Sequence, residues 1–382
     1  MTGRILYLQY TDPAGYPPLE RSSALLARRG WKVLFLGTRA WGGANLEMAA
    51  HPNVEVLRLP FCAGGWRQKA HYLEFCLWAV FRAIFWRPDW IYASDAIACP
   101  AALFLEAIGF RRVVYHEHDS PGPRPPTGFF ERRILSARKR VAQRARLCLL
   151  PNQERARLFE EQTVLPSKAQ VIWNCPSKEE VQESKKGLGP GTLRLLYQGT
   201  LNPERLPWAV LEALTVLPAG VTLDVVGYET IGHPLYVEML RQRVIEHGLS
   251  GRVRIHPPLS RSQGLWRLAL SADVGLALVS GLSWDFNVKN LVGASNKAFE
   301  YLAAGLCLLV PDFPEWRKTF VDPGYGAACN PDDPESIRDA LRGLLDNPGR
   351  MRLMGEEGRK RILSDWNYET QFAPVLKRLE EE

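Results

Sequence analysis

The sequence predicts an α/β protein with two Rossmann-like domains, and three observations support this. The chain has 382 residues, which is long for one domain and typical of two. Residues 4–37 show the order strand, Gly/Pro loop, helix and strand, which predicts a βαβ unit with a parallel sheet. A second such pattern begins with the apolar strand at 193–199, and the polar segment 177–190 between the two patterns predicts a linker.

Further strands are expected wherever a short apolar run ends in polar or turn residues. They are 88–95, 112–115, 147–152 and 170–176 in the first half, and 221–227, 252–259, 272–279 and 306–310 in the second. Ligands of such sheets collect at the carboxyl ends of the strands. The loop that contains Gly15 follows the first strand and is therefore a candidate site wall, although a plain connecting loop is equally compatible. The glycine fingerprint of dinucleotide-binding sites is absent from it.

The composition narrows the classes of function. Hydrophobic residues make up 46% of the chain, enough for two cores, and no apolar run reaches the length of a membrane span. We expect no signal peptide, and the seven scattered cysteines predict free thiols in a reducing cytoplasm. The net charge of +7 suits nucleic acid, an anionic membrane surface or an anionic substrate. Because no common nucleic-acid motif occurs, we favour a phosphate-bearing substrate and a membrane surface.

Two segments suggest contact with a membrane surface. The segment 66–90 combines tryptophan and phenylalanine with basic residues, which suits the headgroup boundary, although a core helix with surface arginines is the alternative. The segment 131–146 is strongly basic and can attract anionic lipid or form an ordinary solvated face. Its basic residues are Arg132, Arg133, Arg138, Lys139, Arg140, Arg144 and Arg146.

Polar residues follow two strands of the first half. Asp95 ends the strand at 88–95, and His116-Glu117-His118-Asp119 follows the strand at 112–115. The latter group resembles a metal site at first sight. Its members alternate along extended backbone, however, and no second cluster of ligands occurs elsewhere, so we expect no metal. We interpret His116 as a structural histidine.

The stretch 295–310 carries the strongest functional pattern. Ser295 can cap a helix that runs to residue 304, and Gly305 suits the position after its end. Asn296, Lys297 and Glu300 lie on the face opposite the apolar one. A helix start with a lysine can hold a phosphate, and a carboxylate one turn later can bind a ribose diol. An ordinary charged helix face is the alternative.

The sequence Asn-Lys-x-Phe-Glu-Tyr-Leu-Ala-Ala-Gly at 296–305 resembles the donor-binding motif of the retaining glycosyltransferases of family 4 (glycosyl transferases group 1). This resemblance extends over nearly the whole chain and implies the GT-B fold, in which two Rossmann-like domains face an interdomain cleft. It implies an N-terminal acceptor-side domain at 1–176, the linker at 177–190 and a nucleotide-sugar domain at 191–364. The helix at 365–382 is expected to pack back on the N-terminal domain.

The resemblance also implies roles for individual residues. His118, Arg205 and Lys297 are the expected catalytic residues, with Asp95 beside His118 on the sugar and acceptor side. Gly199 lets the diphosphate approach the backbone. The expected donor-binding residues are Gly199, Arg205, Leu259, Ser295, Asn296, Lys297 and Glu300.

Two positions depart from the family pattern. Thr200 stands where many members have an arginine, and Val292 stands where the first glutamate of the motif faces the donor sugar. We expect Asn287, Lys289 and Asn290 to take over contacts with the sugar. The departures leave open a catalytically inactive, membrane-associated partner subunit. A nucleotide-sugar epimerase of the same fold is a further alternative.

The expected function is retaining transfer of a hexosyl or related sugar from a nucleotide diphosphate sugar to an acceptor hydroxyl. The acceptor is expected to be a lipid-linked or polysaccharide precursor in glycan biosynthesis. Cationic side chains and the helix start would stabilise the departing diphosphate, so neither metal nor cofactor is expected. The expected location is the cytoplasm, with peripheral attachment at the inner face of the cytoplasmic membrane as an option. No nucleic-acid partner is expected.

Overall fold

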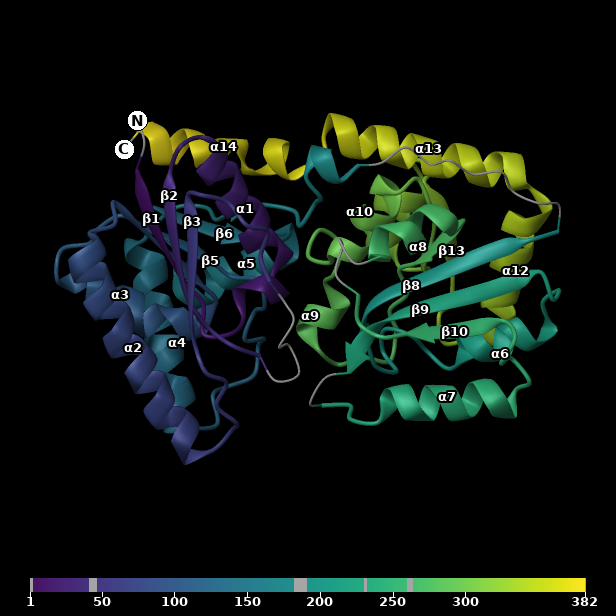
Figure 1. Ribbon diagram of the computed structural model, residues 1–382, viewed down its shortest axis with the longest axis horizontal. Helices are drawn as coiled ribbons and strands as arrows, with labels where there is room; N and C mark the ends of the chain where they lie inside the picture. Colours follow the sequence, from purple (N-terminus) through teal and green to yellow (C-terminus); the bar gives the residue numbers. More distant parts are fainter. Residues whose placement is uncertain (1–2, 41–46, 182–190, 230–231, 260–263, 382) are drawn as a thin grey trace. The chain divides into compact units, whose positions relative to one another are not determined.

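The computed structural model describes residues 3–40, 47–181, 191–229, 232–259 and 264–381. The chain divides into two compact units, Met1–Asn174 with Tyr368–Glu382, and Cys175–Asn367 (Figure 1). Most of the expected linker, residues 182–190, lies outside the described residues. The expected pair of parallel Rossmann-like sheets is confirmed, one in each unit.

Unit 1 contains a seven-stranded parallel sheet in the order β3-β2-β1-β4-β5-β6-β7. Its strands are β1 (Arg4–Leu8), β2 (Lys32–Thr38), β3 (Val54–Leu59), β4 (Trp90–Ser94), β5 (Val113–His116), β6 (Leu147–Leu150) and β7 (Gln170–Val171). The sequence analysis did not predict β3, an edge strand in which Glu55 and Arg58 interrupt the apolar pattern. The last strand is shorter than expected, since only two residues of 170–176 pair with β6.

Helices cover both faces of this sheet (Figure 1). The helices α2 (Trp66–Trp86), α3 (Cys99–Ala107), α4 (Phe129–Arg144) and α5 (Gln153–Thr163) pack on one face, and α1 (Pro17–Arg28) and α14 (Tyr368–Glu381) on the other. Side chains of β1 alternate between the two cores, with Ile5 and Tyr7 in one and Leu6 and Leu8 in the other. The C-terminal helix α14 is therefore part of the core of unit 1.

Unit 2 contains a six-stranded parallel sheet in the order β10-β9-β8-β11-β12-β13. Its strands are β8 (Leu193–Leu201), β9 (Val221–Glu229), β10 (Val253–His256), β11 (Val274–Leu276), β12 (Cys307–Pro311) and β13 (Gly326–Cys329). Its helices are α6 (Ala209–Val216), α7 (Tyr236–Glu246), α8 (Trp266–Ser271), α9 (Phe286–Lys289), α10 (Asn296–Ala303), α11 (Pro314–Trp316), α12 (Pro334–Asp346) and α13 (Pro348–Ser364).

The strand order reverses once in each sheet, and ligands of doubly wound folds bind at such a reversal. In unit 1 the reversal lies between β1 and β4, and in unit 2 it lies between β8 and β11. The loops after these four strands therefore define one candidate half-site in each unit. Helix α10 follows the loop after β11 in the chain and precedes β12.

The expected helix at 295–304 is confirmed as α10. The Ser295 hydroxyl accepts a hydrogen bond from the backbone N–H of Lys297, and Gly305 follows the helix with φ of 71°. Phe299 is fully buried and contacts Phe320 and Trp366 edge-on. Tyr301 is also fully buried. The apolar face of α10 thereby fixes the position of its polar face.

Gly275 of β11 gives Tyr301 its space, and we predict that Gly275→Ala destabilises unit 2. A Cβ at this position would lie 2.2 Å from Cγ of Tyr301. Overpacking of this kind costs about 1–3 kcal/mol, so the urea midpoint should fall. In Gly343→Ala, by contrast, the added Cβ meets no atom within 4 Å on α12. This control should gain about 0.5–1 kcal/mol. Equal midpoints for Gly275→Ala and the wild type would contradict the packing argument.

Candidate functional site

The half-site of unit 2 begins at Gly199, near the carboxyl end of β8. Its φ is 116°, in the region that favours glycine. A Cβ there would lie 3.4 Å from Cε of Lys297. A side chain at position 199 would therefore occupy the approach to the lysine. The missing side chain leaves room for a ligand against the backbone.

Lys297 lies above the ring of Tyr197, with Nζ 3.9 Å from the ring centroid. Burial lowers the pKa of Lys297 well below its usual value, and the positive charge of Arg205 lowers it further. Glu300 opposes this effect. An anion bound beside these two basic groups would raise the pKa of Lys297, because a nearby opposite charge favours the charged form. The expected cluster of Arg205, Lys297 and Glu300 thus comes together within one unit.

Glu300 is positioned by the end of β8. Its Oε2 accepts a hydrogen bond from Nε2 of Gln198 at 2.7 Å. The backbone N–H of Gln198 in turn donates to the Tyr301 hydroxyl at 2.8 Å. Sequence reasoning missed Gln198, although its place directly before Gly199 at a strand end was a usable signal.

The residues that were expected to bind an anion lie at the start of α10. The distance between the Ser295 hydroxyl and the N–H of Lys297 is 3.4 Å, and Asn296 is the first helical residue. The helix dipole adds partial positive charge at this end. Leu259 is half-buried and follows β10, which lies two strands from β8 in the sheet. Parallel pairing places it at the same edge of the sheet as Gly199.

A backbone hydrogen bond joins the two loops of this half-site. The backbone N–H of Arg205 donates to Oδ1 of Asn202 at 2.9 Å, which shapes the turn after β8. The N–H of Ser280, in the loop after β11, donates to the carbonyl of Glu204 at 2.8 Å. The turn that carries Arg205 is therefore held against the loop that leads to α9.

Three residues expected on the sugar side lie in or beside α9. Asn287 is half-buried, and its N–H donates to the capping residue Asp285 at 2.6 Å. Nδ2 of Asn290 donates to the carbonyl of Phe286 at 2.9 Å, so part of this amide is used within its own turn. Lys289 is exposed and lies 5.1 Å from the ring centroid of Trp284.

Trp284 and Val292 lie on either side of α9 in the sequence. Trp284 is 91% exposed and was not among the expected site residues, although a tryptophan in a polar loop was a usable signal. An exposed indole is suited to stacking on a sugar ring. Val292, which replaces the first glutamate of the family motif, is a buried apolar side chain.

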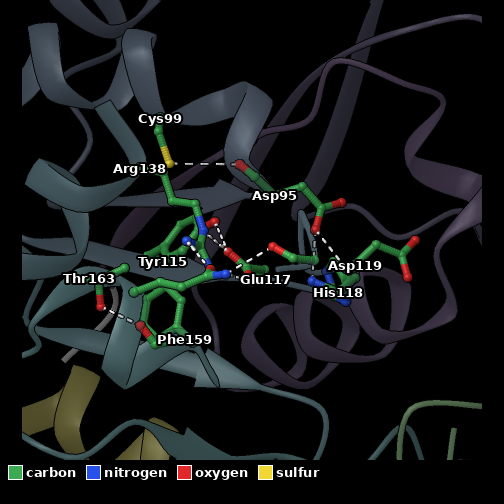
Figure 2. A network of polar contacts seen from close by, with 11 residues as sticks. Asp95, Cys99, Tyr115, Glu117, His118, Asp119, Arg138, Phe159 and Thr163 are labelled. Atoms are coloured by element: carbon green, nitrogen blue, oxygen red, sulfur yellow. Dashed lines mark hydrogen bonds and ion pairs between the residues drawn. The ribbon is translucent and has the colours of Figure 1, made fainter. Parts of the chain in front are cut away.

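The half-site of unit 1 centres on Asp95, directly after β4. Its backbone has φ 61° and ψ 165°, a conformation that costs an ordinary residue about 1–3 kcal/mol. Oδ1 accepts hydrogen bonds from the N–H groups of His118 at 2.7 Å and Asp119 at 3.3 Å (Figure 2). Burial and the charge of Asp119 raise the pKa of Asp95 to about 8, although the two hydrogen bonds oppose this.

His118 is 6% exposed, and neither ring nitrogen has a hydrogen-bond partner among the described residues. Its ring centroid lies 3.9 Å from that of His116 and 5.5 Å from that of Tyr16. Burial, and then the positive charge of Arg155, lower the pKa of His118 to about 3. The imidazole is therefore neutral and retains one donor and one acceptor, which suits an uncharged hydroxyl.

His116, the last residue of β5, and Glu117 contact neighbouring side chains. Nδ1 of His116 is 2.6 Å from the Tyr92 hydroxyl, whereas its Nε2 has no hydrogen-bond partner among the described residues. Glu117 forms a buried ion pair with Arg138, with Nη2–Oε1 at 2.8 Å, and also accepts from the Tyr115 hydroxyl (Figure 2). Among the described residues no group of three or more His, Cys, Asp or Glu could hold a metal.

Arg138 differs from the other basic residues of the segment 131–146, because its side chain is only 4% exposed and is paired with Glu117. Gly15 lies in the short helix Pro13–Gly15 after β1 and is exposed. A Cβ there would meet no atom within 4 Å, so the fold of the loop does not require glycine.

The raised pKa of Asp95 predicts how stability depends on pH. Folding favours the protonated carboxyl, so its contribution is complete below the unfolded pKa of about 4 and is lost as the pH rises to about 8. Asp95→Asn keeps an acceptor for the His118 N–H but does not ionise. We expect the melting temperature of the variant, relative to that of the wild type, to rise between pH 5 and pH 8.

The lowered pKa of His118 reduces the stability of the folded protein as the pH falls below about 6.5. Because the wild type and the variant both contain His118, this effect cancels in the difference between their melting temperatures. Asp346→Asn, at the exposed end of α12, is the matched control and should follow the wild type at every pH. If the Asp95→Asn curve also runs parallel to that of the wild type, the carboxyl is not protonated in the folded protein.

Two families match the sequence. Residues 19–175 match the family described as glycosyl transferase 4-like domain, and residues 208–377 match the family described as glycosyl transferase-like. Together the two matches span most of the chain. No curated protein matches it.

Solved structures share the fold of the whole chain. HepE of Anabaena in complex with UDP-glucose has 18% identity and a TM-score of 0.74, with 100% of both chains covered. Sucrose-phosphate synthase from Thermosynechococcus elongatus has 15% identity and a TM-score of 0.75, covering 99% of this chain and 98% of that one. WaaG, a glycosyltransferase involved in lipopolysaccharide biosynthesis, has 14% identity and a TM-score of 0.68, covering 97% and 98%.

At these identities the structural similarity establishes the fold, whereas the family matches establish the membership. The second family match includes the motif at 296–305. The chain belongs to the group 1 (family 4) glycosyltransferases and has the GT-B fold.

Proposed function

We propose that this glycosyltransferase moves a hexosyl or related sugar from a nucleoside diphosphate sugar to an acceptor hydroxyl, with retention of the anomeric configuration. The observation that carries the proposal is the cluster of Arg205, Lys297 and Glu300 at the start of α10. Lys297 and Arg205 disfavour each other's positive charge, and a diphosphate bound beside them would relieve this repulsion. Glu300, held by Gln198, is matched to a ribose diol.

The leaving group gains negative charge as the bond between the sugar carbon and the phosphate oxygen breaks. Lys297, Arg205 and the N-terminus of α10 would stabilise this charge, which is the role that a metal ion has in other transferases. The diphosphate would also raise the pKa of Lys297 toward its usual value, which favours the cationic form of the lysine. We propose that the transfer needs no metal and no cofactor.

Retention follows if the acceptor oxygen attacks the face from which the diphosphate departs. The new bond joins the acceptor oxygen to the anomeric carbon, and the proton of the acceptor hydroxyl passes to the departing phosphate oxygen. The neutral imidazole of His118 is suited to hold a hydroxyl of the sugar or the acceptor. Asp95 positions His118 through the backbone hydrogen bond of 2.7 Å.

The nature of donor and acceptor is a further part of the proposal. HepE was solved with UDP-glucose, which makes UDP-glucose the first donor to examine. WaaG is involved in lipopolysaccharide biosynthesis, and this favours a lipid-linked or polysaccharide precursor as acceptor. Such an acceptor would be met at the inner face of the cytoplasmic membrane. None of the described helices is both long and apolar enough to cross a membrane.

A second candidate is a catalytically inactive partner subunit with the same fold. The buried Val292 favours it, because a glutamate stands there in the family motif. Nucleotide-sugar epimerisation is a third candidate, which would yield an isomerised nucleotide sugar without an acceptor. The three candidates therefore differ in their products.

The test measures release of UDP from UDP-glucose and other UDP-hexoses, with the product followed by proton NMR. We expect an α-linked or α-configured sugar product from an α-configured donor. Lys297→Met should lower kcat/KM by about a hundredfold or more, because it removes a charge that acts on the leaving group. Lys318→Met, on an exposed lysine of the same unit, is the control and should retain activity.

Each other outcome has a defined meaning. A β-configured first product would contradict retention. An isomerised nucleotide sugar would identify an epimerase. Binding of UDP-sugars without turnover for any donor would favour the inactive partner subunit. Equal loss of activity in both lysine variants would contradict the specific role of Lys297.

A further inference from the structure

Helix α2 has two apolar faces, only one of which is buried. Tyr72, Phe75, Ala79 and Ala83 point into the core of unit 1. The opposite side carries six large apolar residues that are between 49% and 75% exposed. They are Trp66, Leu73, Leu77, Phe81, Ile84 and Phe85, and we refer to them as the outer face of α2.

The spacing of these residues makes the outer face continuous. Leu73, Leu77, Phe81 and Phe85 follow one another at four-residue intervals, which places them along one side of the helix. The rings of Phe81 and Phe85 are 4.6 Å apart. Exposed apolar residues that occur singly are normal on a protein surface, whereas a contiguous stripe of this length indicates an interaction surface.

The charges around the outer face are mainly positive. Within α2 the basic residues Arg67 and Lys69 are exposed, and Glu74 is the one acidic residue. Helix α3 packs between α2 and α4 on the same face of the sheet (Figure 1). The outward side of α4 adds exposed basic residues to this layer, and these are Arg132, Arg133, Lys139, Arg140 and Arg144.

Ion pairs remove only part of this charge. Arg144 pairs with Glu106 of α3 at 3.0 Å, and Arg82 pairs with Glu55 of β3 at 3.7 Å. Trp78 packs against the core and does not belong to the outer face. Only part of the aromatic segment 66–90 is therefore exposed and able to contact a partner.

A surface hollow of about 360 Å³ adjoins the C-terminal end of this face. Its walls include the apolar Phe85 and Trp86, the cationic Arg4 and Lys32, and the acidic Glu55. Arg4 is 6.0 Å from the ring centroid of Trp86, and Nζ of Lys32 is 2.7 Å from Oδ1 of Asn53. The ring of Phe85 belongs to both the hollow and the outer face. The two cations suit a phosphate headgroup beside acyl chains, and the carboxylate of Glu55 is paired with Arg82.

We infer that the outer face of α2 inserts into the headgroup boundary of an anionic membrane, with the basic residues of α4 above the lipid phosphates. Interfacial helices have this composition. Their phenylalanine, leucine and tryptophan side chains enter the boundary between headgroups and acyl chains, and their basic residues contact the headgroups. A second copy of the chain fits less well. A two-fold interface would bring the same positive charges against themselves. The inference specifies the surface behind the proposed lipid-linked acceptor, but its test requires no catalysis.

The test is co-sedimentation of the full chain with vesicles. One set contains equimolar phosphatidylglycerol and phosphatidylcholine, and the other contains phosphatidylcholine alone. We expect binding to the anionic vesicles that weakens as salt is added, and little binding to the neutral ones. Leu77→Glu with Phe81→Glu should weaken binding by about tenfold or more, since two apolar groups leave the interface.

Two further variants separate the contributions. Arg132→Glu with Arg133→Glu leaves the apolar stripe intact and should remove the preference for anionic vesicles. Ile245→Glu, at a position on α7 that is 70% exposed, is the matched control for an added surface glutamate and should bind as the wild type does. Because all these positions are exposed, melting temperatures should stay close to that of the wild type.

Three outcomes would overturn the inference. The first is vesicle binding by the Leu77→Glu, Phe81→Glu variant that equals that of the wild type. The second is an absence of binding to anionic vesicles. The third is a dimer in solution that this variant dissociates, which would assign the outer face to self-association. None of these results depends on glycosyl transfer. A failure of the membrane inference would therefore leave the proposed function untouched.

Discussion

The contact between α10 and the end of β8 is the interaction on which the donor half-site depends. Three neighbouring residues of the helix each meet this strand. Lys297 lies over Tyr197 beside Gly199, Glu300 accepts from Gln198, and the Tyr301 hydroxyl accepts from the backbone of Gln198. The packing that places Tyr301 against Gly275 therefore also sets the positions of the cation and the carboxylate. Fold stability and ligand geometry are coupled here through a single helix.

Unit 1 achieves a comparable result by different means. Asp95 is held in a costly backbone conformation at the strand reversal, and its carboxyl binds the backbone of the next loop. The buried pair of Glu117 and Arg138 fixes the same loop from the other side (Figure 2). Between these two anchors His118 keeps both ring nitrogens without a partner among the described residues. Buried polar atoms without a partner require an explanation, and a bound ligand hydroxyl would provide one for His118.

The sequence predicted what depends on local periodicity and failed where tertiary packing decides. The helix that begins at Asn296, its cap and Gly305 follow from residue types at fixed spacing. Strand β3 was missed because its charged residues break the apolar pattern at the sheet edge. The burial of Arg138 could not be foreseen, since its partner Glu117 lies 21 residues away and reads locally as part of a metal-like group. Likewise, nothing in the spacing of α2 distinguished its inner from its outer apolar face.

Thermal stabilisation by UDP-, GDP-, ADP- and dTDP-sugars, each with and without magnesium, is the decisive experiment for the donor site at the start of α10. A ligand at a hundred times its Kd stabilises the folded state by about 2.7 kcal/mol, which is a readily measured shift of Tm. We expect a shift of Tm that is selective for one nucleobase and is the same with and without magnesium. A complete absence of shifts, or shifts that require magnesium, would contradict a donor site built on Lys297, Arg205 and the start of α10.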